Sequence, residues 1–208
     1  FAKPTVRNTL SPSAAGYVID GRINDAFLAV NRMLQAGVDV ERMTSTQVSA
    51  DAGMALGSFW VPATDGTRAM LEELARDHGV RATSLPTRPA SGLTKVRKPR
   101  IALLDRYGGS MPSGWTRWLS EQFEFPFTVV YPPEIDRGDL SKYDVLVLVD
   151  GMTFGSGGGR RGGGDDEPGS LIPAEWQARM GSLTSATSLP KVREFVEKGG
   201  TVVAIGSA

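Results

Sequence analysis

The sequence contains no cysteine and a single histidine, His78, among its 208 residues. Without cysteine the chain forms no disulfide, offers no thiolate to a metal and has no cysteine nucleophile. One histidine does not complete the three-ligand set that a catalytic zinc normally takes. A Ser-His-Asp triad would need His78 as its base, and no G-x-S-x-G motif supports one. The sequence therefore predicts no metal site in this chain.

The chain also has no net charge and no long apolar run. The 23 basic and 23 acidic side chains cancel, so no overall field selects nucleic acid or an anionic membrane. No stretch approaches the roughly 20 apolar residues of a membrane span. The opening FAKPTVRNTL lacks the apolar core of a signal peptide. We expect no nucleic-acid partner and no membrane span.

Two α/β lobes are predicted from apolar runs that alternate with helical periodicity. His78 falls in the last turn of a predicted helix, where the helix dipole favours it. Residues 86–99 hold three prolines and no acidic residue, which predicts a solvated linker. The first lobe, residues 1–85, is expected to contain strands at 17–20, 57–62 and 80–85, and helices at 24–36 and from Asp65 to Gly79.

The second lobe, residues 100–208, contains four apolar runs rich in β-branched residues. Such runs fit parallel strands that are covered on both faces. With helices at 114–123 and 189–198 between them, they predict a doubly wound, mostly parallel α/β sheet with helices on both faces. Whether the two lobes share one sheet stays open. We expect 201–205 to be an interior strand and the lobe to be truncated after it; the other strands are predicted at 100–105, 127–131 and 144–149.

Residues 151–170 are rich in glycine, with nine in the segment. Three of them satisfy G-x-G-x-x-G, but the sequence GGDDEPGS that follows cannot open the helix that a dinucleotide site requires. We interpret the segment as a flexible insertion and expect residues 155–169 to be mobile. Asp165, Asp166 and Glu167 are interpreted as solvated acids.

Two aspartates, Asp105 and Asp150, follow predicted strands of the second lobe. Ligands of open α/β sheets bind at the carboxyl ends of strands, so a crevice is expected there. Trp115 and Trp118 are three residues apart and share one face of a predicted helix. They could close a pocket, form an interface or pack in the core.

The runs RIALLDRYGGSMPSGWTRWLSEQFEFPFTVV, KYDVLVLVDG and LPKVREFVEKGGTVVAIGSA resemble a known family. They are similar to the class I glutamine amidotransferase-like, flavodoxin-like domain of bacterial zinc-carboxypeptidase-like proteins. GYVIDGRINDAFLAVNRMLQAG resembles the segment that precedes that domain. The resemblance covers the chain from about Gly16 onward, and GWTRW-x3-Q-x2-FPF and FVEKGGTVVAIG are its more specific motifs.

The family resemblance implies a nucleophilic cysteine directly after a strand, in a pattern like A-I-C-H-G. Gly206 occupies that position here and Ser207 comes one residue late, so the nucleophile elbow is degenerate. The resemblance then implies a non-catalytic accessory domain that packs on the peptidase domain of the same parent protein, or recruits its peptide or glycan substrate. It also implies a secreted or periplasmic parent, a zinc metallocarboxypeptidase whose zinc lies only in the peptidase domain. No cofactor is expected in this chain.

Two alternatives stay open. The chain could be a cysteine-independent hydrolase that uses Ser207 or the pair Asp105 and Asp150. It could also be a small-molecule or glycan-binding module built on the strand-end crevice and the tryptophans. Ser207 within hydrogen-bond reach of His78 would favour hydrolysis, whereas an apolar cleft lined by both indoles would favour binding.

Overall fold

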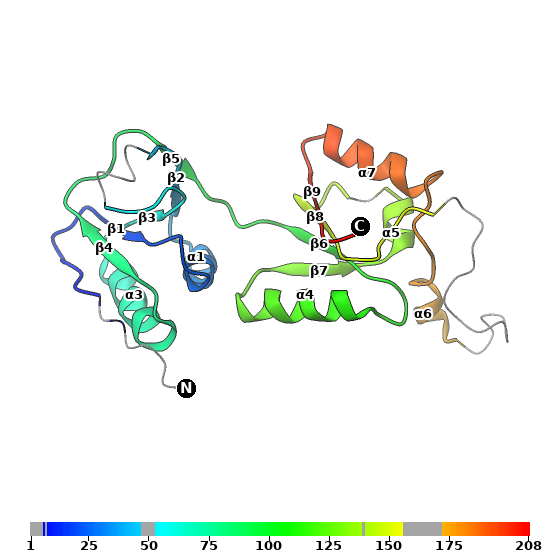
Figure 1. Cartoon of the computed structure of the whole chain (residues 1–208), viewed down its shortest axis with the longest axis horizontal. Helices are drawn as coiled ribbons and strands as arrows, with labels where there is room; N and C mark the ends of the chain where they lie inside the picture. Colours follow the sequence, from blue (N-terminus) through cyan, green and yellow to red (C-terminus); the bar gives the residue numbers. More distant parts are fainter. Residues whose placement is uncertain (1–5, 7, 47–52, 139, 156–171) are drawn as a thin grey trace. The chain divides into compact units, whose positions relative to one another are not determined.

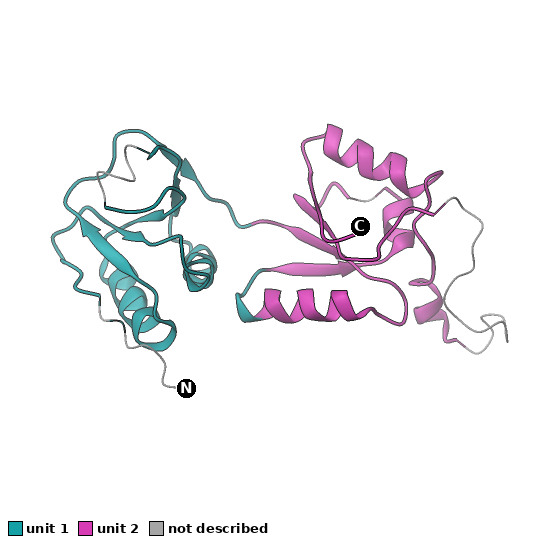
Figure 2. Cartoon of the chain, in the orientation of Figure 1, with its two compact units in different colours: residues 1–98, 122–125 teal, residues 99–121, 126–208 magenta. Residues whose placement is uncertain are grey.

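The computed structural model describes residues 6, 8–46, 53–138, 140–155 and 172–208. It divides into two compact units (Figure 2). Unit 1 comprises Phe1–Lys98 with Gln122–Phe125, and unit 2 comprises Pro99–Glu121 with Pro126–Ala208. Most of the predicted insertion, including its three acidic residues, lies outside the described residues, so the expected mobility of 155–169 stays a prediction.

The described strands of unit 1 form a five-stranded sheet in the order β4-β1-β3-β2-β5 (Figure 1). All four of its strand pairs are antiparallel, so the parallel pairing predicted from the runs of the second lobe does not extend to this one. The two lobes form separate sheets. The elements of unit 1 are β1 (Gly16–Ile19), α1 (Asp25–Gln35), β2 (Glu41–Met43), β3 (Phe59–Pro62), α3 (Asp65–His78), β4 (Ala82–Leu85) and β5 (Leu93–Lys95).

The antiparallel sheet of unit 1 is covered on both faces, so its strands resemble those of a parallel sheet in sequence. Tyr17 and Ile19 of β1 belong to the large cluster that also includes buried apolar residues of α1 and α3. Val18, which points to the opposite face, packs with Met43 and Trp60 in a second cluster. A strand buried on both sides is apolar at every position, whatever the direction of its neighbours.

The predicted linker is partly a strand. β5 lies within residues 86–99 and pairs antiparallel with β2. Arg88, expected to be solvated, makes an ion pair of 2.8 Å with Glu41 and lies over the Trp60 ring, 5.4 Å from its centroid. The prolines and basic residues of this segment predicted irregular structure. Instead, the pairing of β5 with β2 and the contact of Arg88 with Trp60 bind the segment to unit 1.

Helix α3 ends as the sequence predicts. Gly79 caps it in the left-handed conformation with φ 71°, and His78 is its last residue. At the other end, the side chain of Thr64 accepts a hydrogen bond from the Thr67 amide, so Thr64 is the N-cap and Asp65 is the first residue of the helix. His78 is thus placed as a helix-terminal residue of unit 1.

The described strands of unit 2 form a four-stranded parallel sheet in the order β7-β6-β8-β9, as expected for this lobe. β9 lies at the edge of these strands, so its predicted interior position is wrong. Its residues are as apolar as those of an interior strand, yet Val203 is 42% exposed. The elements are β6 (Ile101–Leu104), α4 (Met111–Gln122), β7 (Phe127–Val130), α5 (Pro132–Asp136), β8 (Val145–Leu148), α6 (Ala174–Gln177), α7 (Ser188–Glu197) and β9 (Thr201–Ala204).

One face of this parallel sheet carries the main core of unit 2. Leu104 of β6 and Leu146 of β8 pack with Ile135 of α5 and with Val192 and Phe195 of α7. All five are buried. Because the four strands are parallel, their carboxyl ends lie together at one edge of the sheet.

Candidate functional site

Three of the predicted site residues follow parallel strands of unit 2. Asp105 comes directly after β6, Asp150 follows β8, and Gly206 follows β9. The order of the strands places β8 between β6 and β9. The aspartates and the glycine therefore lie along one edge of the sheet, but they do not form one group.

Asp150, Gly206 and Ser207 form a compact turn. The backbone amide of Ser207 donates to Asp150 Oδ1 at 2.8 Å, and the Ser207 hydroxyl donates to the same oxygen at 2.7 Å. Gly206 has φ 66°, and a Cβ built on it would lie 2.5 Å from Asp150 Oδ1. The turn therefore requires glycine at this position for two reasons, its backbone conformation and the neighbouring carboxylate.

The hydrogen bonds of this turn stabilise the ionised form of Asp150. The Ser207 amide, the Ser207 hydroxyl and the Gly151 amide, in that order, lower the pKa of the Asp150 carboxyl below its ordinary value. Such a carboxylate is a weak proton acceptor at neutral pH. The Ser207 hydroxyl therefore donates its hydrogen bond to a carboxylate that is a poor base for removing its proton.

We expect the Asp150 turn to make the stability of the folded chain depend on pH in the acid range. Because the folded pKa is lowered, its contribution is present above the unfolded pKa of about 3.9 and is lost as the pH falls through the folded value. The melting temperature of Asp150→Asn should lie below that of the parent at neutral pH, and the two should converge below about pH 4. Circular dichroism melts across this range measure the gap. A gap that is constant or widens in acid would contradict the assignment.

Trp115 and Trp118 lie on α4, outside the hydrophobic core clusters of the described residues and outside the lining of the pocket at Asp105. They are 60% and 50% exposed, and their rings meet edge to face at 5.8 Å with an interplanar angle of 90°. They share one helix face, as their spacing predicts. Perpendicular rings present no common flat surface for stacking a sugar, so this pair does not favour the glycan-binding alternative.

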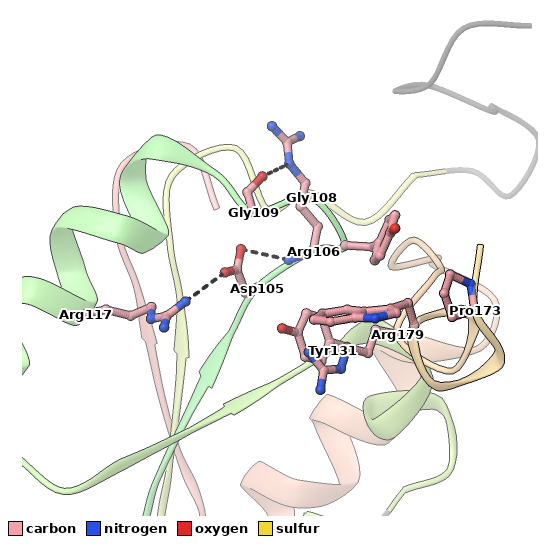
Figure 3. Close-up of a pocket in the computed structure, with 10 residues that line it drawn as sticks. Asp105, Arg106, Gly108, Gly109, Arg117, Tyr131, Pro173 and Arg179 are labelled. Atoms are coloured by element: carbon pink, nitrogen blue, oxygen red, sulfur yellow. Dashed lines mark hydrogen bonds and ion pairs between the residues drawn. The ribbon is translucent and has the colours of Figure 1, made fainter. Parts of the chain in front are cut away.

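Asp105 lies in a different place from Asp150, in a pocket of about 530 Å³ (Figure 3). Of the residues predicted to line a crevice, Asp105 alone contributes to this described pocket. The pocket opens where β6 and β7 end, because residues 105–109 continue β6 and Tyr131 follows β7 directly. It is lined by residues 105–109, Arg117 of α4, Tyr131, Pro173, Trp176 of α6 and Arg179.

Asp105 is the buried charge of this pocket, with 3% of its surface exposed. Its Oδ1 accepts from the Arg106 amide at 2.8 Å, and its Oδ2 lies 3.9 Å from Arg117 Nη1. Figure 3 shows the Arg117 side chain reaching toward this carboxylate. Arg106 instead turns back and donates from Nε to the Gly109 carbonyl at 3.1 Å. Asp105 therefore serves to position the loop and Arg117.

The opposite side of the pocket is aromatic. The Arg179 guanidinium lies 4.4 Å from the Trp176 ring centroid and 5.4 Å from that of Tyr131. Such contacts attract the cation to the negative ring faces and restrict its rotation. Arg179 is thus held at the pocket by two aromatic side chains.

Sequence reasoning found one side of this pocket and missed the other. The strand-end rule that selected Asp105 also applies to Tyr131, and the glycines of DRYGGS between a strand and a helix mark an open loop. Trp176 and Arg179 carry no comparable signal, because α6 is a single short turn. Only the fold brings them to the ends of β6 and β7.

No group of three or more histidine, cysteine, aspartate or glutamate side chains among the described residues could hold a metal ion. No described helix is long and apolar enough to cross a membrane.

The chain was also compared with known proteins. No protein family, no curated protein and no solved structure matches it.

Proposed function

We propose that unit 2 is a non-catalytic ligand-binding domain whose site is the pocket at the carboxyl ends of β6 and β7. One observation carries the proposal: a cavity of about 530 Å³ opens at these strand ends and is lined by charged and aromatic side chains. Its volume falls in the range of small-molecule sites, and its place is where open α/β sheets bind ligands.

We further propose that unit 2 has the doubly wound, flavodoxin-like arrangement of an amidotransferase-like domain. Counted along the chain, its strands lie in the order second, first, third, fourth, which agrees with the start of the flavodoxin-like order 2-1-3-4-5. Right-handed crossovers from β6 to β7 and from β8 to β9 run in opposite directions across the sheet. Such crossovers would place α4 and α7 on opposite faces, as a doubly wound sheet requires.

The sequence motifs support an origin of this domain in a secreted zinc-carboxypeptidase-like protein. In that setting the domain would be an accessory to the peptidase domain of its parent and would present a ligand to it. The degenerate elbow supports a non-catalytic role, because Gly206 has no side chain and the chain has no cysteine. The turn around Asp150 argues against the hydrolase alternative, because Ser207 is bound to a carboxylate of lowered pKa.

A fragment screen by NMR on the complete 208-residue chain tests the binding role. We expect members of a mixed set of small acids, amines and neutral rings to shift the amide signals of Gly108 and Gly109 and the indole signal of Trp176. Trp176→Ala should abolish these shifts, whereas Trp118→Ala should preserve them. The two tryptophans are a matched pair, because they are 41% and 50% exposed and only Trp176 lines the pocket. Failure of every fragment to move these signals, or chemical conversion of a bound fragment, would refute the proposal.

A further inference from the structure

We propose that the ligand of this pocket is an organic anion, a carboxylate or phosphate monoester on a flat ring, and that Arg179 binds its charged group. This inference rests on the proposed binding function of the pocket. It follows from the charges, the aromatic contacts and the open loop that line the pocket.

The described lining of the pocket carries an excess of positive charge. The lining contains three arginines, Arg106, Arg117 and Arg179, and a single carboxylate, that of Asp105. Arg117 is the guanidinium that pairs with Asp105, and Arg106 is tied to a neutral backbone carbonyl. Arg179 contacts rings, and no carboxylate among the described residues pairs with it. An anion would therefore complete the charge balance of the pocket.

The way Arg179 is held suits it to bind a planar anion. A guanidinium stacked against ring faces keeps its N–H donors in its own plane, beyond the edges of the rings. Carboxylates and phosphates accept pairs of such donors side by side, with short, charge-assisted hydrogen bonds. Tyr131 and Trp176 thus orient the donors of Arg179 before any ligand arrives, which reduces the entropy lost on binding.

The loop across the pocket leaves room for a ligand to approach the backbone. Gly108 and Gly109 have φ 83° and 75°, and a Cβ on either would meet no atom within 4 Å. They lie just before α4, whose dipole makes its N-terminus favourable to negative charge. The positive end of this helix dipole therefore lies close in sequence to the lining of the pocket.

Two aromatic side chains at the pocket remain partly open to solvent and suit a ring on the ligand. Tyr107 is 39% exposed and Trp176 is 41% exposed. Exposed aromatic surface beside convergent polar groups is typical of sites that bind flat organic molecules. An aromatic carboxylate or an aromatic phosphate ester combines this ring with the anion that Arg179 selects.

Titration calorimetry with four probes tests the inference: phenyl phosphate, benzoate, benzyl alcohol and inorganic phosphate. We expect phenyl phosphate or benzoate to bind about tenfold or more tightly than benzyl alcohol, and to weaken as ionic strength rises. The stronger of the two identifies the anion. Inorganic phosphate should bind less tightly than phenyl phosphate, and equal affinity would overturn the requirement for a ring.

Two variants test whether Arg179 is responsible for the preference for anionic probes. Arg179→Gln should weaken binding of the anionic probe by about tenfold or more, and Arg179→Lys should restore little of it, since an ammonium lacks the paired donors. The matched control is Arg193→Gln, which removes one charge from an exposed position of α7 outside the pocket lining and should leave affinity nearly unchanged. Unchanged melting temperatures establish that the variants fold.

The outcomes separate this inference from the proposed function. If benzyl alcohol shifts the pocket signals as strongly as the acids and Arg179→Gln changes nothing, the anion inference is wrong while the pocket remains a binding site. If neither acids nor alcohol shift those signals, both proposals fail.

Discussion

Leu146→Ala should lower the free energy of unfolding of unit 2 by about 2–5 kcal/mol, the typical cost of truncating a buried leucine in a packed core. Leu146 is fully buried in β8, which pairs with strands on both sides. It packs in the cluster that joins the sheet to α5 and α7. The loss of its methyl groups therefore leaves a cavity. Because β8 is paired with a strand on each side, its backbone cannot move to fill that cavity.

Amide hydrogen exchange, measured at increasing urea concentrations, reports this effect separately in each unit. Protection of the amides of β6 and β8 should fall, while protection of β1 and β3 in unit 1 should change little. Val203→Ala is the control, because Val203 lies on edge strand β9 and is 42% exposed, so its truncation should cost about 0.5 kcal/mol or less. Equal losses in the two variants would show that the cluster around Leu146 is not the core of this unit.

Gly206→Cys is expected to destabilise unit 2 by about 1–3 kcal/mol and to create no glutaminase. The residue has φ 66°, which a side chain rarely adopts, and the new Cβ would lie within 3 Å of the Asp150 carboxylate. The collision would also displace the acceptor of both Ser207 hydrogen bonds. Chemical denaturation measures the stability, and ammonia release from glutamine measures the activity.

Gly199→Cys separates backbone strain from collision. Gly199 has φ 94°, but a Cβ there would meet no atom within 4 Å. It should therefore cost less than Gly206→Cys, and the difference measures the contact with Asp150. A Gly206→Cys chain as stable as its parent, with a thiol that turns over glutamine, would restore the catalytic interpretation of this turn.

The strands of unit 2 were predictable because their signal is local. Each of the four apolar runs predicted a strand within one or two residues of its observed ends, and their β-branched character also predicted parallel pairing. The same rule does not extend to unit 1. Val18 and Trp60 cover the second face of an antiparallel sheet, so its strands are as apolar as parallel ones.

The candidate site was predictable only in part. Asp105 could be found because it follows a strand, but Asp150 follows a neighbouring strand and belongs to a separate turn with Ser207. Trp115 and Trp118, which were predicted to line the crevice, are exposed on α4. Trp176, which does line the pocket, lies on a single helical turn and has no periodic neighbours in the sequence.

By itself the sequence determined the residue chemistry of this protein and much of its local structure. It excluded thiol chemistry, located the apolar runs of unit 2, and placed Asp105, Asp150 and Gly206 at the ends of strands. Only the tertiary structure decided the direction of the strands in unit 1, the edge position of β9 and the meeting of Tyr131, Trp176 and Arg179 at one pocket. The reason is that residue identity and periodicity act over neighbouring positions, whereas pairing partners and pockets depend on contacts between segments far apart in the chain.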